Sequence, residues 1–216
     1  MTYNIHHGRG LDFRVSMDRI AETIKKENPD IVGINEADKY NIRSWFVNQP
    51  SLLSRLLGMN YFFGQNLKLW FMRYGNIVLS KTGIINAENI LLPCRGEQRG
   101  YIRSTLDFGK EKIAFICTHL DFMSSERPTQ VAEIVDVVKK TDTPAIVVGD
   151  FNCGKEDLSP LLNLIKLTEE VKTHPASNPQ HTIDHILCSH HFEIVNTYTV
   201  NSTASDHLPL VAILKL

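Results

Sequence analysis

Polar side chains that could hold a metal ion or move a proton recur at the ends of the strand-like, apolar runs of this sequence. They are carboxylates, amides and imidazoles: Asn4, Asn35, Glu36, His119, Asp150, Asn152, Asp184, His185, Asp206 and His207. Any one of them could instead form a turn, since Asp and Asn side chains hydrogen-bond to nearby backbone. Because six separate apolar runs end in this way, we expect the residues to converge on one site.

The donor atoms of this set favour a hard divalent cation. Carboxylate and amide oxygens suit Mg²⁺ or Mn²⁺, which commonly serve phosphoryl substrates. A zinc hydrolase would usually offer H-E-x-x-H or three converging histidines. The adjacent pairs His6-His7 and His190-His191 should point to opposite faces of an extended chain, so we do not expect them to chelate. The sequence has no G-x-S-x-G, Walker or G-x-G-x-x-G motif, which argues against serine esterases, nucleoside triphosphatases and dinucleotide-binding enzymes.

The elements that must position these residues are strands with a few helices. Apolar periodicity and turn residues predict a helix between Ser16 and Asn28 and further helices at 51–57 and 127–140. Strands are predicted at 1–5, 31–34, 61–63, 76–80, 83–89, 101–108, 112–117, 145–148, 183–187, 193–200 and 208–214. Several consecutive strands without an intervening helix indicate antiparallel pairing. The pattern predicts the α/β class, with two sheets packed face to face and helices outside.

Length and composition set the broad class. The chain has 216 residues, which together with the lack of a Pro/Gly/Ser linker favours a single domain, 1–216. Its 43% hydrophobic and 22% charged residues are typical of globular proteins and argue against a disordered chain or a disulfide scaffold. A formal net charge of −1 gives no global basic field, so nucleic-acid binding would need a local basic groove.

The cysteines and the N-terminal residues bear on the compartment. Cys94, Cys117, Cys153 and Cys188 are too far apart for a C-x-x-C motif and are expected to be reduced thiols that pack in the core or have no special role. Apolar stretches are too short for a transmembrane helix. No leader precedes Met1, which predicts a cytoplasmic location for the chain as given. Met1 already stands in the first predicted strand, so a secreted or periplasmic location after removal of a leader stays open.

Seven motifs in order carry a resemblance to a known family. They are TYNIHHG (2–8), INEAD (34–38), YGNIVLSK (74–81), THLD (118–121), VGDFN (148–152), IDHI (183–186) and SDHLP (205–209). Together they resemble the endonuclease/exonuclease/phosphatase superfamily, which includes deoxyribonuclease I, repair nucleases, sphingomyelinases and inositol polyphosphate phosphatases. The resemblance covers nearly the whole chain and implies a four-layer α/β sandwich with two mixed, mostly antiparallel sheets.

The resemblance also implies a metal site and a reacting pair. Glu36 is expected to be the principal Mg²⁺ ligand, with Asn4 beside it, and Asp206 lies where some members place a second metal. Asp150 would orient or deprotonate the attacking water. His207 would contact the scissile phosphate. The chain has Asn35 where the family more often has Gln, which changes the neighbour of the carboxylate and leaves the carboxylate itself intact.

The remaining expected residues surround this centre. Asn152 would place the water or a phosphate oxygen, and Asp184 would hold the imidazole of His207 in one tautomer. His119 matches the second histidine of the family, and Glu97 falls where its carboxylate partner is expected. Two further residues, Arg99 and Arg43, are candidates for contacts to the substrate phosphate.

The sequence therefore predicts a Mg²⁺- or Mn²⁺-dependent phosphodiesterase or phosphomonoesterase. A small molecule, a lipid headgroup or a sugar phosphate is the expected substrate. A nuclease is the first alternative, for which Trp45, Phe46, Trp70, Phe71 and Arg73 could stack or clamp bases, although aromatics beside apolar residues are expected in the core. A non-catalytic binding module on the same fold is the second alternative, and a missing motif residue, of which there is none, would favour it. Oligomeric state and the number of metals are left open.

Overall fold

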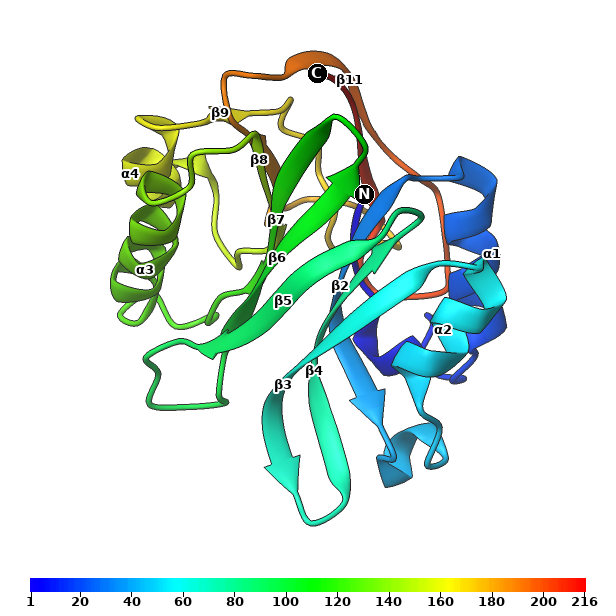
Figure 1. Cartoon of the computed structure of the whole chain (residues 1–216). Coiled ribbons are helices and arrows are strands. Elements are labelled where there is room, and N and C mark those ends of the chain that lie inside the picture. Colours follow the sequence, from blue (N-terminus) through cyan, green and yellow to red (C-terminus); the bar gives the residue numbers. More distant parts are fainter.

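The computed structural model describes all residues, 1–216, as two six-stranded sheets with helices on their outer faces. The first sheet has the order β11-β12-β1-β2-β4-β3 and the second β5-β6-β7-β8-β10-β9. Figure 1 shows α1 and α2 on one side of the stacked sheets and α3 and α4 on the other. The predicted four-layer α/β sandwich is confirmed, and only the β1–β2 and β7–β8 pairs are parallel.

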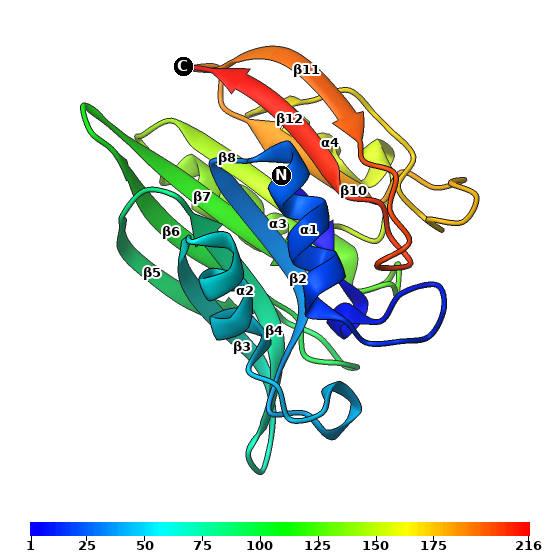
Figure 2. The ribbon, with the colours of Figure 1, turned by 90° about the vertical axis from the view of Figure 1, so that its right-hand side faces the viewer.

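The first sheet and its helices contain both ends of the chain. Its strands are β1 (Thr2–Asn4), β2 (Ile31–Lys39), β3 (Asn60–Leu69), β4 (Met72–Ser80), β11 (Glu193–Thr199) and β12 (Leu210–Lys215). The helices α1 (Met17–Glu27) and α2 (Gln49–Leu57) lie across its outer face (Figure 2). As predicted, Ser16 caps α1 by accepting a hydrogen bond from the backbone of Arg19. Gly58 ends α2 with a positive φ of 66°, which glycine adopts without a Cβ penalty.

The second sheet comes from the middle and later parts of the chain. Its strands are β5 (Ile84–Leu91), β6 (Gly100–Phe108), β7 (Glu111–His119), β8 (Ala145–Asp150), β9 (Lys166–Leu167) and β10 (Asp184–Cys188). Helix α3 (Arg127–Lys139) and the short α4 (Ser159–Leu162) cover it. The sequence did not predict α4 or β9, which are too short to show a periodicity. Leu158, Leu161 and Ile165 fix this segment by packing into the core beneath α3.

Three layers of apolar side chains hold the four layers of backbone together. One packs α1 and α2 on the first sheet and a second packs α3 on the second sheet. The third lies between the sheets and includes Val78, Phe115, Val148 and Ile186. Cys117, Cys153 and Cys188 are buried free thiols, and Cys94 is a free thiol that is partly exposed. None of the helices combines the length and the apolar character needed to cross a bilayer.

The β3–β4 hairpin is much longer than the sequence indicated. The predicted strands 61–63 and 76–80 extend to a paired ladder that ends at Leu69 and Met72, leaving Trp70 and Phe71 as its turn. The outer half of this ladder contains exposed and polar positions, so hydrophobic alternation does not reveal it. As a result the hairpin projects beyond the sandwich, as both ribbon views show.

Candidate active site

A β-bulge in β2 places two consecutive residues at the site. The pairing of β2 with β4 shifts between Ile34 and Ala37, and Glu36 has a φ of 61°. In a regular strand Asn35 and Glu36 would point to opposite faces. The bulge changes the direction of the chain, so that Asn35 is buried between the sheets while Glu36 faces the polar cluster, half-buried.

Asn4 joins the two acidic residues of the cluster. Its Nδ2 donates to Glu36 Oε1 and to Asp150 Oδ2, each at 3.0 Å. Its Oδ1 accepts from the backbone N–H of His6 at 3.0 Å. Asn4 thus holds two carboxylates from different sheets in fixed positions. Its expected role as a metal ligand stays a prediction.

Two buried asparagines connect the sheets directly beneath the cluster. Asn35 Oδ1 accepts from the backbone N–H of Asp150 at 2.9 Å, and its Nδ2 donates to Asn76 Oδ1 at 2.9 Å and to the Thr118 carbonyl at 2.8 Å. Asn76 in turn donates to the Gly100 carbonyl at 2.9 Å. Buried amides of this kind are costly unless all their groups are paired. They therefore fix the register of one sheet on the other.

Asp150 is the centre of the cluster. The preceding Gly149 has a φ of 147°, and an added Cβ would lie 1.9 Å from the Thr118 carbonyl oxygen, so only glycine fits. Asp150 Oδ1 accepts from the backbone N–H of Asn152 at 2.9 Å, and Asn152 itself has a φ of 52°. Burial and the nearby charge of Asp184 raise the pKa of Asp150. A carboxyl group with a raised pKa is suited to accept a proton.

His207 and Asp184 form the expected imidazole–carboxylate pair. Nδ1 of His207 lies 2.8 Å from Asp184 Oδ2, and its Nε2 lies 3.8 Å from Asp150 Oδ2. Burial would lower the pKa of His207, but the charges of Asp184 and Asp150 outweigh it and raise the pKa to about 10. The imidazole is therefore charged at neutral pH and presents Nε2–H beside Asp150.

His119 completes the cluster from β7. Its Nε2 lies 3.6 Å from Asp150 Oδ2 and 3.2 Å from Asn152 Nδ2. Burial and the charge of Arg99 lower the pKa of His119, so this imidazole is neutral. Glu97 was expected to pair with it, but the structure places Arg99 between them. Arg99 Nη1 donates to Glu97 Oε1 at 2.7 Å and lies 3.3 Å from His119 Nδ1. The direct pairing of Glu97 with His119 is therefore wrong.

Comparison with known proteins agrees with this arrangement. A family model described as the Endonuclease/Exonuclease/phosphatase family matches residues 1–207. The chain belongs to this family. Members of the Endonuclease/Exonuclease/phosphatase family are hydrolases that act on phosphoesters and nucleic acids.

Individual relatives are distant in sequence. Protein cwh43 of Schizosaccharomyces pombe is 28% identical over 161 residues, which are 71% of this chain and 16% of that protein. A family structure from Bacteroides vulgatus superposes with a TM-score of 0.82 at 19% identity, covering 100% of this chain and 97% of that one. The catalytic domain of human Nocturnin, solved with a bound sulfate anion, has a TM-score of 0.76 at 20% identity, covering 99% and 91%. These structures share the fold.

Two of the residues expected at the site lie at its edge. Arg43 Nε and Nη2 each donate to Asp38 at 2.9 Å, and the guanidinium carbon lies 5.2 Å from the centre of the Tyr74 ring. Asp206 Oδ2 lies 3.3 Å from His6 Nδ1, and its Oδ1 accepts from Ser205. Neither side chain contacts Asp150. Arg99 is the expected phosphate-binding arginine that lies closest to the cluster, against His119.

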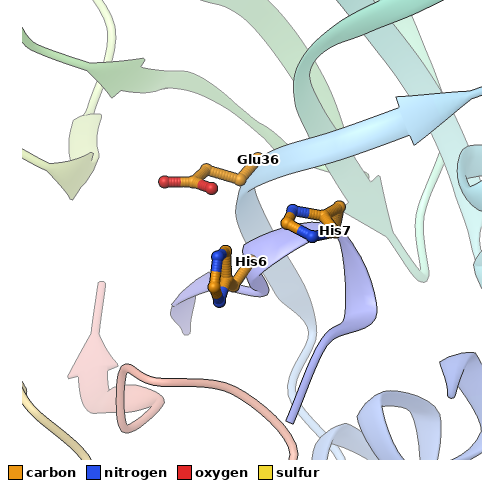
Figure 3. Close-up of side chains that lie close together, drawn as sticks. All are labelled: His6, His7 and Glu36. Carbon is orange, nitrogen blue, oxygen red and sulfur yellow. The ribbon is translucent and has the colours of Figure 1, made fainter. Parts of the chain in front are cut away.

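Sequence reasoning missed three histidines. His6 and His7 were expected to face opposite sides, but they lie in a tight 3-10 turn with φ values of 44° and 46° and their rings are 4.5 Å apart. Figure 3 shows both imidazoles near the Glu36 carboxylate. His174, in the segment between β9 and β10, has its ring 4.6 Å from that of His207. The glycine in His6-His7-Gly8 is the one sequence signal for a turn here, and no signal marks His174.

The donor groups fit a divalent cation. The ligand atoms of His6, His7 and Glu36 lie within 4.8 Å of one another. Those of Asp150, Asp184 and His207 do so as well, but the charged imidazole of His207 has no nitrogen lone pair for an ion. Asp184 Oδ1 is buried without a hydrogen-bond partner. Of the three expected metal residues, only Glu36 belongs to one of these groups.

Proposed function

We propose that this chain hydrolyses phosphoester bonds with the aid of a divalent cation held at Glu36. The observation that carries the proposal is the convergence on Asp150 of Glu36 through Asn4 and of the charged His207. A phosphoester repels an anionic nucleophile, so its hydrolysis needs positive charge on the phosphoryl oxygens and a positioned water. In the cluster, His207 offers positive charge, and the Asp150 carboxylate offers a group that can orient a water.

Each residue has one task in this proposal. His207 donates from Nε2 to a phosphoryl oxygen, and Asp184 keeps its imidazole oriented and charged. Asp150 accepts the proton of the attacking water, with its carboxylate fixed by Asn4 and by the Asn152 backbone. His119, neutral and buried, can accept a hydrogen bond beside them. A bound cation supplies the remaining charge neutralisation.

A small phosphorylated molecule or a headgroup is the substrate class we favour. Arg99 and Arg127 are each paired with a carboxylate, as is Arg43. These arginines are therefore not free to follow the phosphates of a duplex, which carries about one charge per 1.7 Å of axis. The experiment is a screen of the purified protein with Mg²⁺ or Mn²⁺ against phosphomonoesters, phosphodiesters, sphingomyelin and DNA. Hydrolysis of none of them would refute the proposal.

One observation favours the nuclease alternative. Trp45, Phe46, Trp70 and Phe71 were expected in the core, but all four are exposed at the surface. Exposed aromatics can stack on unpaired bases. Plasmid nicking, together with a log-log salt slope of DNA affinity steeper than about −3, would establish the nuclease and displace the small-substrate proposal.

A further inference from the structure

His7 contains a buried nitrogen for which the protein supplies no partner. The residue is 7% exposed, and its Nδ1 makes no hydrogen bond. Leaving a buried polar atom unpaired costs about 1–3 kcal/mol. The backbone around it has positive φ at both His6 and His7, a conformation that non-glycine residues rarely adopt. The energetic cost of this arrangement points to a bound ligand whose interactions offset it.

The surroundings of His7 supply the rest of a chelate. One ligand atom each from His6, His7 and Glu36 lies within 4.8 Å of the other two, and Figure 3 shows the three side chains facing a common space. Bonds of about 2.1 Å from nitrogen and oxygen to one ion bring ligand atoms to roughly 3–4 Å from each other, so small side-chain rotations suffice. Asp206 pairs with Nδ1 of His6, leaving Nε2 free. A carboxylate behind a metal-binding imidazole is a common arrangement.

We propose that His6, His7 and Glu36 bind the cation together, and that the ion is a first-row transition metal rather than Mg²⁺. The proposal rests on the cation requirement of the proposed function and specifies its ligands. Mg²⁺ selects oxygen donors, whereas imidazole suits manganese, cobalt and zinc progressively better. The sequence predicts Mg²⁺ or Mn²⁺, and the two histidines argue against Mg²⁺.

The test is direct binding of Co²⁺ and of Mg²⁺ to metal-free protein, by spectroscopic titration and calorimetry. The double variant His6→Gln/His7→Gln should bind Co²⁺ at least about tenfold more weakly and Mg²⁺ unchanged. The matched control is His190→Gln/His191→Gln, an adjacent pair that is exposed. His6→Gln alone, at a half-buried position, provides the same test if the double variant does not fold.

The outcomes separate this proposal from the proposed function. Co²⁺ affinity equal to wild type in the His6 variants, or an equal fall for Co²⁺ and Mg²⁺, would overturn it. Histidine-dependent Co²⁺ binding by a protein that hydrolyses no phosphoester would leave the metal site in place and remove the function instead.

A second, independent observation concerns two loops that meet at one end of the molecule. The segment between β2 and α2 and the turn of the β3–β4 hairpin project together beyond the sandwich in both ribbon views (Figures 1 and 2). The rings of Phe46 and Phe71 are 6.0 Å apart across them. We call the exposed apolar residues of these loops the aromatic tip: Ile42, Trp45, Phe46, Leu69, Trp70 and Phe71.

The aromatic tip is unusually exposed for its composition. Trp70 is 82% exposed, Trp45 78%, Ile42 67% and Leu69 62%. Exposed apolar area costs about 25 cal/mol per Å², and contiguous patches of it mark binding surfaces. Two of the four side chains are aliphatic and cannot stack on bases, so the patch fits acyl chains better than a nucleic acid.

Positive charge surrounds the aromatic tip. Lys68 and Arg73 are paired across the hairpin just before its turn, and Lys39 ends β2 next to it. Asp38, the carboxylate next to Lys39 in the chain, is buried and already bound by Arg43. Cations around an apolar tip complement the phosphates of anionic lipids, to which each contributes about 1 kcal/mol.

We infer that the aromatic tip docks on an anionic lipid surface. Glu36 lies on β2, which ends at Lys39 just before the loop that contains Ile42 and Trp45, so docking brings the cluster around Asp150 toward the headgroups. One consequence of docking, the delivery of a headgroup substrate to the site, rests on the proposed function. Binding itself can be measured without turnover.

The chain offers a specific probe, because its two tryptophans are both in the aromatic tip. Vesicles of phosphatidylcholine with phosphatidylserine should shift the fluorescence to shorter wavelength and protect it from an aqueous quencher. Ile42→Ser/Leu69→Ser should weaken vesicle binding at least about tenfold, since each buried Leu or Ile contributes roughly 1.5–3 kcal/mol. Val195→Ser, an exposed apolar residue on β11 at the opposite edge of the sheet, is the matched control.

Three results would overturn the inference. One is fluorescence that vesicles leave unchanged. A second is equal loss of binding in the Val195 control. The third is a response to short single-stranded DNA in place of vesicles, which would assign the tip to base stacking. Lipid binding by a protein without phosphoesterase activity would uphold docking and refute the proposed function.

Discussion

The polar cluster around Asp150 includes Glu36 of β2, the aromatic tip lies beyond the end of that strand, and the two regions differ in what holds their side chains. In the cluster, Asn35 and Asp150 are buried and each is hydrogen-bonded to groups of the other sheet. In the tip, Trp45 and Trp70 are mostly in solvent. Replacing a cluster residue therefore disturbs partners in both sheets, whereas the tip residues contribute little to folding. The exposure of so much apolar surface points to binding.

The largest effect should follow removal of the reacting groups. His207→Ala and Asp150→Ala should each reduce turnover of a phosphodiester by about 10³- to 10⁴-fold, because the phosphoryl donor or the proton acceptor is lost. Single-turnover kinetics measures this. Both residues are buried rather than open to solvent, so a loss of stability is also expected. His191→Ala, at an exposed position, is the control, and a His207 variant with the wild-type rate would end the catalytic assignment.

A smaller but severe loss is expected for Asp184→Asn. The substitution keeps the shape of the side chain and removes the charge that raises the pKa of His207. In wild type the imidazole stays charged until the pH approaches its pKa of about 10. In the variant this pKa falls, so the activity that depends on the charged form should be lost at a lower pH. A pH–rate profile with an unchanged alkaline limb would contradict the assignment.

Glu36→Gln should weaken binding of the divalent cation at least about tenfold while the protein remains folded, because one oxygen donor loses its charge. Calorimetric titration with Mn²⁺ measures the affinity, and thermal unfolding checks the fold. Glu111→Gln, exposed on β7, is the control. Chelator-treated wild type that keeps its full rate would refute the cation requirement itself.

Asn35→Ala tests whether the cluster is also what joins the sheets. The variant leaves the Asp150 N–H, the Asn76 oxygen and the Thr118 carbonyl without their partner. We expect a loss of about 1–3 kcal/mol in the free energy of unfolding, measured in urea. Asn201→Ala, which is exposed, should change it little. Equal free energies of unfolding for the two variants would show that Asn35 does not join the sheets.

The smallest effect is expected at the aromatic tip. Trp45→Ser and Trp70→Ser should each change the free energy of unfolding by no more than about 0.5 kcal/mol, as surface substitutions do. Urea unfolding followed by circular dichroism measures this without the tryptophan signal. A loss above about 2 kcal/mol would mean that these rings pack in the core, and the contrast between the two regions would disappear.

The sequence by itself determined the family, the layers and most residues of the polar cluster around Asp150. Its strands show hydrophobic alternation or apolar runs, and the motifs containing Glu36, Asp150, Asp184 and His207 are local in the chain. Capping residues such as Ser16 and Gly58 also act on their own neighbours, so the ends of α1 and α2 could be predicted.

Only the tertiary structure decided what depends on contacts between distant segments. The positive φ values that bring His6 and His7 beside Glu36 contradict the extended chain that was assumed for them. The placement of Arg99 between Glu97 and His119 is set where β6 meets β7. The exposure of Trp45 and Trp70 follows from the length of a hairpin that packs on nothing beyond the sandwich. The hydrophobicity of a side chain indicates how much free energy its burial would contribute. Whether the side chain is buried depends on the contacts that the fold provides.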